Sequence, residues 1–223
     1  MANLHLRSTL SGMLPGTVRD RLRPVGHKVL GLMFAGKAAK AIKNCRDNKL
    51  PIRIIIGAGS DRYDGWIETD KYVLDICSPE NWALCFEPST VDAILAEHVL
   101  EHLSLEENKI ALSSAFHYLK PGGRFRIAVP DGNRKDAVYH ADVAPPADGH
   151  KMLFDLKSLS ALLEEIGFVV KALEYFDEKD EFRAIEWKSE EGHIRRSVRY
   201  DRQENFRRGN LFFTSLIVDA LKP

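Results

Sequence analysis

Two glycines and a later aspartate form a pattern that is typical of a ligand-binding turn. Gly57 and Gly59 follow an isoleucine-rich stretch, and Asp70 ends the next strand-like stretch. Glycine has no Cβ, so the backbone can turn sharply there and lie against a ligand. A carboxylate after the second strand can accept two hydrogen bonds from a ribose diol. G-x-G alone is a weak signal, because ordinary turns share it, so the interpretation depends on the rest of the chain.

Residues that can move protons come later in the chain. His98 follows the fourth predicted strand, and Asp131, His140 and His150 share the polar loop after the fifth. Imidazole, with an ordinary pKa of ~6.5, can take a proton from a hydroxyl near neutral pH. We expect His98 and His150 to be the leading candidates for a general base, with Asp131 and His140 at the same edge of the sheet. For each histidine the alternative is a surface or supporting residue.

One motif has a competing interpretation. His98, Glu101 and His102 spell H-x-x-E-H, the inverted zinc-peptidase pattern. That chemistry needs both histidines on one face of a long helix and a third ligand in a cleft. Here the match straddles a strand end, and Ser104 caps the helix only afterwards. We therefore expect no metal site.

Alternating strands and helices must position these residues. Helices are predicted after the capping residues Ser104 and Asp155. Strands are predicted at Ile52–Ile56, Trp66–Asp70, Tyr72–Ile76, Val91–Glu97, Arg124–Pro130, Phe168–Leu173 and Leu211–Leu221. This alternation predicts an α/β fold with a doubly wound, mostly parallel sheet that binds ligands at the carboxyl ends of its strands. The last strand is expected to be antiparallel and to lie with its neighbour at one edge.

Two stretches depart from a regular alternation. Only about a dozen residues separate Gly57 from Asp70, too few for a crossover helix, so the first connection is predicted to be a loop or a single turn. Residues 182–200 alternate in polarity around Glu190–Gly192 and predict an exposed hairpin inserted in the domain.

Composition restricts the class of protein. The 223 residues are 44% hydrophobic, enough for one full core, and no apolar run approaches the ~18 residues of a membrane span. The start has no continuous apolar segment, so no secretory signal is expected. The three cysteines show no C-x-x-C spacing, which favours a reducing cytoplasm over a disulfide scaffold.

Charge is distributed unevenly. Residues 1–50 contain ten Lys and Arg against two Asp, a net charge of +8, so residues 51–223 carry −8. We interpret residues 1–50 as a basic helical extension and residues 51–223 as the ligand-binding domain. The extension either makes a peripheral contact with an anionic membrane or substrate, or packs on its own acidic domain. No recognition-helix pattern is present, so no nucleic acid is expected as a partner.

Five motifs in order carry a resemblance to a known family. They are Ile56–Gly59, Gly65–Asp70, Leu95–Leu103, Leu119–Phe125 and Val129–Asp131. With them, the chain from Ile52 to Lys222 resembles the class I S-adenosylmethionine-dependent methyltransferases, in particular small bacterial type-11-like members with a shortened first crossover. The resemblance implies a Rossmann-like fold and S-adenosyl-L-methionine as the cofactor.

The resemblance also implies which residues bind the cofactor. Gly57, Ala58 and Gly59 would lie against its methionyl part, and Asp70 would bind the ribose hydroxyls. Asp75 would accept a hydrogen bond from the adenine amino group. Ile76 would pack on the ring.

At the other end of the cofactor, Glu97 and His98 would face the methionine end and the methyl group. The chain departs from the family pattern at two positions. Ile55 stands where Asp or Asn is usual, and Asp61 replaces the usual third glycine. Both changes leave the amino-acid end of the cofactor with fewer expected contacts.

The expected function is transfer of a methyl group to a small, glycan-linked or lipid-linked acceptor, at oxygen rather than nitrogen, with a histidine as general base. One alternative is a catalytically degenerate scaffold subunit that binds S-adenosylmethionine, suggested by Ile55 and Asp61. Another is a nicotinamide-dependent dehydrogenase, which is disfavoured because G-x-G-x-x-G would require glycine at Arg62.

Overall fold

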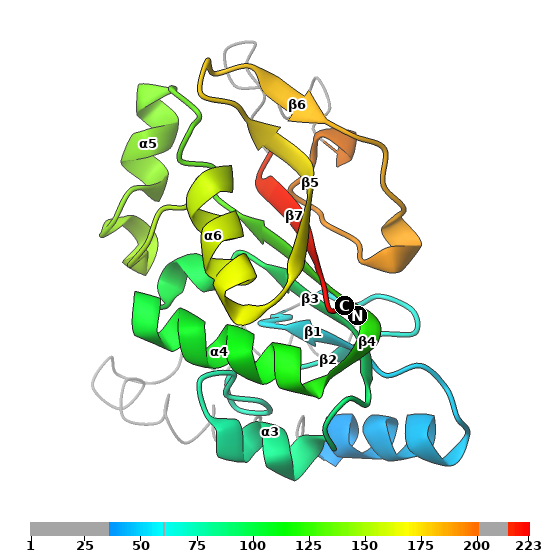
Figure 1. Cartoon of the computed structure of the whole chain (residues 1–223). Helices are drawn as coiled ribbons and strands as arrows, with labels where there is room; N and C mark the ends of the chain where they lie inside the picture. The colour runs from blue at the N-terminus through cyan, green and yellow to red at the C-terminus, as the bar shows by residue number, and fades with distance from the viewer. Residues whose placement is uncertain (1–35, 60, 201–213) are drawn as a thin grey trace, which may run out of the picture.

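A single seven-stranded sheet organises the molecule (Figure 1). The computed structural model describes residues 36–59, 61–200 and 214–223. The strand order is β2-β1-β3-β4-β7-β5-β6. The strands are β1 (Arg53–Ile56), β2 (Ile67–Glu68), β3 (Val91–Glu97), β4 (Leu119–Val129), β5 (Val169–Phe176), β6 (Phe182–Ala184) and β7 (Leu216–Leu221). Strands β1 to β4 pair in parallel, and β7 is antiparallel to both neighbours. The Rossmann-like α/β class and the antiparallel last strand are confirmed.

The position of β7 differs from the sequence-based prediction. This strand lies inside the sheet between β4 and β5, whereas a pair at one edge was expected. Its residues Leu216 to Ala220 are all buried, as is usual for a strand covered on both faces. The short strand β6 occupies the edge instead, paired with β5.

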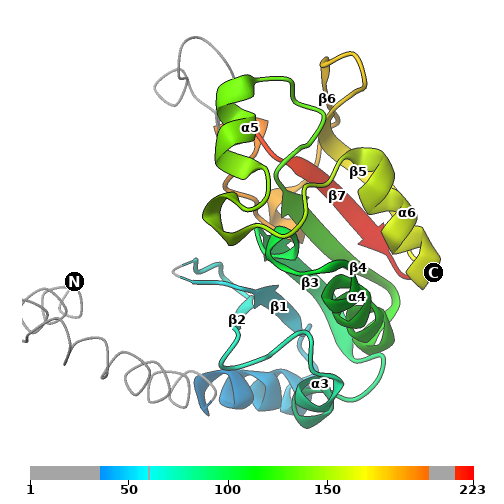
Figure 2. The same ribbon diagram turned by 90° about the vertical axis from the view of Figure 1, so that its left-hand side faces the viewer.

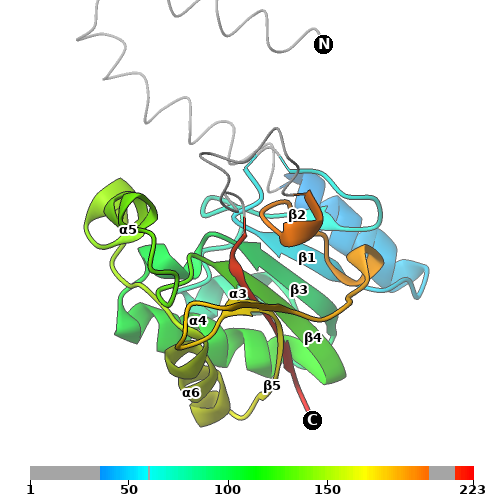
Figure 3. The ribbon, with the colours of Figure 1, turned by 90° about the horizontal axis from the view of Figure 1, so that it is seen from above.

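Two helices cover one face of the sheet: α4 (Leu105–Tyr118) and α6 (Leu156–Ile166) (Figure 3). Ser104 forms a capping box with Glu107, and Asp155 caps α6, both as predicted. Buried Leu159, Leu162 and Leu163 of α6 belong to the same core cluster as the inward side chains of β3 and β4. The shorter helices are α3 (Pro79–Cys85) and α5 (Ala137–Val143).

The opposite face is covered by an irregular segment, residues 185–200 (orange in Figure 3). Trp187 and Ile194 are buried there in one cluster with Ile55 and Leu95 of the sheet. The expected hairpin over residues 182–200 is not formed, because beyond β6 the segment contains only the single turns Ser189–Glu191 and Val198–Tyr200.

Side chains of the sheet explain why this segment forms no hairpin. Arg126 Nη1 donates to the carbonyls of Lys188 and Gly192, at 2.9 and 2.7 Å. Glu97 accepts from the backbone N–H groups of Arg195 and Arg196, at 3.0 and 2.7 Å. Because these backbone groups already have partners on the sheet, they are not paired with each other as in a strand ladder.

The loops beside β2 also differ in part from expectation. The described residues between β1 and β2 contain no helix, which confirms the shortened first connection. The strand or extended segment expected at Tyr72–Ile76 is instead a series of turns. These turns form because the Asp70 carbonyl accepts from the N–H groups of Val73 and Leu74, at 2.9 and 2.8 Å.

The basic extension is described only from residue 36, so the predictions for residues 1–35 lie outside the described residues. A helix over residues 36–47 lies beside α3 (Figure 2). Ala38 and Ile42 are buried one turn apart, so one apolar face of this helix packs on the domain. Lys37 Nζ lies 3.1 Å from Glu68 Oε2, so one basic side chain of this helix pairs with the acidic domain. Within the described residues, no helix is long and apolar enough to cross a membrane.

Candidate functional site

The carboxyl ends of β1 and β3 meet at one edge of the sheet. Ile56 is paired with Ala96, so the glycine turn and His98 follow their strands side by side. Strands β1 and β3 are neighbours although β2 and α3 separate them in the chain, and such a switch in strand order is where doubly wound sheets bind ligands. The sequence-based placement of the site at this edge therefore agrees with the topology.

The glycine turn has a conformation that favours glycine. Gly57 has φ +64° and Gly59 has φ +52°, in the left-handed region. The Ala58 N–H donates to the Thr69 carbonyl at 2.9 Å, which holds the turn against the end of β2. A Cβ at Gly59 would meet only one backbone atom, at 3.9 Å, so the turn leaves room for a ligand.

Asp70 lies on this same connection, directly after Thr69. Its Oδ1 accepts from the Tyr72 N–H at 2.9 Å, and no hydrogen bond to Oδ2 occurs within the described part of the chain. Asp70 is half-buried, so one carboxylate oxygen is left to accept a hydroxyl. Glycines that open space beside the backbone and an available carboxylate fit the ribose and methionyl parts of S-adenosylmethionine.

Gly57→Ala tests the glycine turn. A Cβ there would lie 2.7 Å from Val99 Cγ2, so Val99, next to His98, must move. We expect at least a tenfold loss of affinity for S-adenosylhomocysteine, measured by isothermal titration. Gly65→Ala is the matched control, because Gly65 has φ +77° but a Cβ added to it would meet no heavy atom within 4 Å, leaving only backbone strain of ~1–2 kcal/mol. Adding Val99→Ala should restore affinity; equal behaviour of the two glycine variants would contradict the assignment.

The two adenine candidates lie on the turns between β2 and α3. Asp75 Oδ1 accepts from the Cys77 N–H at 3.1 Å, and its side chain is half-buried. Ile76 is 7% exposed and belongs to the main core cluster. The Ile76 carbonyl accepts from the Trp82 indole at 3.1 Å, which fixes this turn on α3.

Two acidic candidates hold backbone segments in place. Both oxygens of Glu97 are bonded to the irregular segment 185–200, as described above. Asp131 is fully buried, and its carboxylate accepts from the N–H groups of Asn133 and Phe176 at 3.0 and 2.7 Å. In these positions Glu97 and Asp131 join loops to the ends of β3 and β5.

The protonation of Asp131 gives a testable pH dependence. Burial raises the pKa of Asp131 to about 6, above its ordinary value of 3.8. The unfolded chain thus releases this proton at lower pH than the folded protein, so the contribution of Asp131 to stability falls as the pH rises from about 4 to about 6, by on the order of 2–3 kcal/mol. Urea unfolding at several pH values should show the stability of the wild type falling by this amount relative to that of Asp131→Asn. An identical pH slope for both proteins would contradict this assignment.

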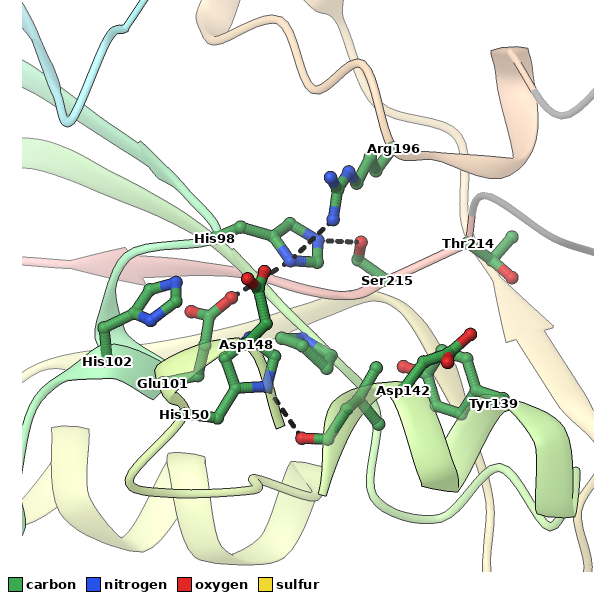
Figure 4. A pocket seen from close by; sticks show the side chains of 12 residues that line it. His98, Glu101, His102, Tyr139, Asp142, Asp148, His150, Arg196, Thr214 and Ser215 are labelled. Atoms are coloured by element: carbon green, nitrogen blue, oxygen red, sulfur yellow. Dashed lines mark hydrogen bonds and ion pairs between the residues drawn. The ribbon is translucent and has the colours of Figure 1, made fainter. Parts of the chain in front are cut away.

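A pocket of about 360 Å³ opens beside His98. Its lining comes from the ends of β3, β4 and β7, from the turn Leu100–His102, from α5 and the loop after it, and from segment 185–200 (Figure 4). The lining residues are His98, Glu101, His102, Pro130, Tyr139, Asp142, Val143, Asp148, His150, Arg196, Thr214 and Ser215. The structure thus brings His98 and His150 together, whereas Asp131 and His140 are not among the lining residues.

His98 makes contacts through both ring nitrogens. Its Nε2 lies 2.9 Å from Ser215 Oγ, and its Nδ1 lies 3.0 Å from Glu101 Oε1 and 3.1 Å from Arg196 Nη1. A protonated Nδ1 can donate to Glu101, whereas an unprotonated Nδ1 can accept from Arg196. In the first case Nε2 carries the lone pair and can accept a proton from a hydroxyl. The left-handed backbone of His98, φ +54°, is an outlier of the kind found at functional sites.

Sequence reasoning did not assign Ser215, Arg196 or Tyr139 to this pocket. Ser215 is 117 residues from His98 in the chain, Arg196 lies in the segment predicted to be an exposed hairpin, and Tyr139 lies in a predicted loop without a motif. Glu101 was noticed only as part of H-x-x-E-H. Its placement directly behind the His98 ring depends on the single turn Leu100–His102, which no periodicity indicates.

Residues 36–173, more than half of the chain, match the model of a family described as a methyltransferase domain. No match is found among curated proteins. Solved structures with similar folds include a SAM-dependent methyltransferase from Archaeoglobus fulgidus, 15% identical over 83% of this chain and 94% of that one, with a TM-score of 0.46. Another is described as a possible histamine N-methyltransferase from Thermotoga maritima, 16% identical over 90% and 97%, with a TM-score of 0.44.

Proposed function

Because the chain belongs to the methyltransferase-domain family and is an S-adenosylmethionine-dependent methyltransferase, we propose that it methylates a hydroxyl oxygen with His98 as general base. The acceptor is a small, glycan-linked or lipid-linked molecule. The observation that carries this proposal is the contact of His98 with Ser215. The Ser215 hydroxyl lies 2.9 Å from Nε2, so this nitrogen can approach a hydroxyl to the distance over which a base takes a proton.

The residues around His98 support its role as a base. Glu101 Oε1, 3.0 Å from Nδ1, favours the tautomer in which Nε2 is unprotonated, and it stabilises the imidazolium formed when the proton arrives. The same carboxylate orients the ring, so Glu101 is a positioning residue. The geometry Glu101–His98–hydroxyl is thus that of an oriented base.

Methyl transfer to a hydroxyl needs no reactant besides S-adenosylmethionine and the acceptor. When bound, S-adenosylmethionine supplies a methyl group on a sulfonium, which is electrophilic without further activation. The acceptor oxygen forms the new bond to this methyl carbon, the carbon–sulfur bond breaks, and the hydroxyl proton passes to His98 Nε2. The chain itself has to hold both reactants in line and exclude water.

The pocket supports the acceptor class. Its volume of about 360 Å³ is at the lower end of the range for small-molecule sites. Arg196 lines it and can pair with a phosphate or carboxylate on a glycan-linked or lipid-linked acceptor. Tyr139 stays a neutral phenol because burial raises its pKa.

The test is transfer of a labelled methyl group from S-adenosylmethionine to a panel of acceptors. The panel contains free sugars, sugar nucleotides, lipid-linked sugars and matched amines. We expect a labelled methyl ether, identified by mass spectrometry, from a hydroxylated member. Methylation of the amines alone would contradict the assignment to oxygen. Binding of S-adenosylhomocysteine without transfer to any acceptor would favour the scaffold alternative.

A further inference from the structure

We propose that Glu101, His102 and His150 bind a divalent transition-metal ion of the zinc class in the wall of this pocket. One ligand atom of each residue lies within 4.8 Å of the others. Glu101 and His102 come from the turn after β3, and His150 comes from the loop after α5 (Figure 4). The two imidazole rings meet edge to face, with centroids 4.8 Å apart.

Glu101 provides the strongest reason to expect a cation. Its side chain is 1% exposed, and Oε1 lies 3.0 Å from His98 Nδ1, whereas Oε2 has no hydrogen-bond partner in the described part of the chain. A buried carboxylate oxygen without a partner is unfavourable unless a cation compensates it. Because His98 lies against Oε1, Oε2 remains for a metal bond.

His150 is oriented as a metal ligand. Its Nδ1 lies 2.7 Å from the Val143 carbonyl, which can only accept, so Nδ1 carries the proton. The other nitrogen, Nε2, is therefore the unprotonated one that a metal requires. In metal-bound histidines, the ring nitrogen that does not bind the metal commonly donates to a backbone carbonyl, and this hydrogen bond fixes the tautomer.

The backbone holds the two halves of the cluster together. The N–H groups of Lys151 and Met152 both donate to the Glu101 carbonyl, at 2.7 and 3.0 Å. These bonds fix the His150 loop against the turn that carries Glu101 and His102. His102 makes no side-chain hydrogen bond to any described residue, so its ring can rotate toward an ion.

The set of ligands indicates the class of ion. Two imidazoles and one carboxylate suit zinc and similar divalent ions, whereas Mg²⁺ and Ca²⁺ prefer oxygen ligands. Bonds of about 2.0–2.2 Å to zinc require ligand atoms closer than 4.8 Å, which rotation of His102 can supply. Three protein ligands leave a fourth position open toward the pocket.

This site differs from the zinc-peptidase pattern considered for the sequence. There, His98 and His102 would be the paired ligands; here His98 is outside the cluster, and His150 completes it. The proposal departs from the expectation of no metal. Binding of the ion does not depend on methyl transfer. The ion could also hold an acceptor oxygen at its open coordination position, and only this role rests on the proposed function.

The test uses the full-length protein, freed of metal with a chelator and then titrated with Zn²⁺ or Co²⁺. Expected results are one site per chain by competition with a chromophoric chelator, and a Co²⁺ absorption spectrum without thiolate charge transfer. That spectrum distinguishes the site from binding at Cys45, Cys77 or Cys85. No acceptor or methyl donor is present, so failure of the proposed function leaves this readout intact.

Three variants make the test specific. His102→Ala and Glu101→Gln should each weaken Zn²⁺ binding at least tenfold and remove the rise in Tm on adding Zn²⁺. His117→Ala, at an exposed position on α4, is the matched control and should bind as the wild type does. Equal Tm values for metal-free wild type and His102→Ala would show that the fold is intact. Wild-type affinity in His102→Ala, or no Zn²⁺ uptake by the wild type, would overturn the proposal.

Discussion

His98→Asn is expected to lower kcat at least about 100-fold, because general-base catalysis typically contributes 10²- to 10⁴-fold. Asparagine is the replacement of choice, since among residues other than glycine it tolerates the left-handed backbone of His98, φ +54°. The KM for the acceptor and the Kd for S-adenosylhomocysteine should change little. The rate is measured as S-adenosylhomocysteine released with the acceptor that the wild type turns over fastest.

The split between kcat and KM separates a base from a merely structural residue. His117→Asn is the control, because His117 is exposed on α4 and is not among the lining residues of the pocket. It should turn over as the wild type does. If His98→Asn retained kcat within tenfold of the wild type, the proton would have to leave through another group.

Asp219→Ala is expected to lower the free energy of unfolding by about 3–5 kcal/mol, because it removes the bidentate partner of a buried guanidinium and leaves it with the more distant carboxylate of Glu191, 3.8 Å away. Arg126 is fully buried on β4 and donates to both carboxylate oxygens of Asp219 on β7, at 2.7 and 2.9 Å. The same guanidinium binds the carbonyls of Lys188 and Gly192 and lies 4.8 Å from the centre of the Trp187 ring. Losing Asp219 therefore also loosens segment 185–200.

Urea unfolding at 25 °C measures this change. Glu165→Ala is the matched control, because it removes an ion pair of similar length, 2.7 Å, in which both side chains are substantially exposed. Exposed pairs contribute little, so its stability should be nearly that of the wild type. A loss below about 1 kcal/mol in Asp219→Ala would mean that Arg126 is stabilised without its carboxylate partner.

The local parts of the fold were predictable because their causes are local. The isoleucine run of β1 is followed by Gly57 in a left-handed turn that favours glycine, and Ser104 caps α4 through a residue only three positions away. The short distance from Gly57 to Asp70 excluded a crossover helix by length alone. Such features depend on neighbours within a few residues, which a sequence shows directly.

The remaining features depend on partners far apart in the chain. Residues 187–196 lie on the sheet because Glu97 and Arg126 take their backbone groups, and no local pattern shows this. Likewise, Ser215 lies beside His98 only because β7 enters the sheet between β4 and β5. The sequence therefore indicated this edge of the sheet and the two histidines His98 and His150, but not the other residues that line the pocket.

A crystal structure with S-adenosylhomocysteine bound tests the cofactor site most directly. We expect the ribose hydroxyls on the Asp70 carboxylate, the amino-acid part along Gly57–Gly59, and the sulfur facing the pocket that His98 lines. A ribose remote from Asp70, or a sulfur directed away from the His98 pocket, would contradict this expectation.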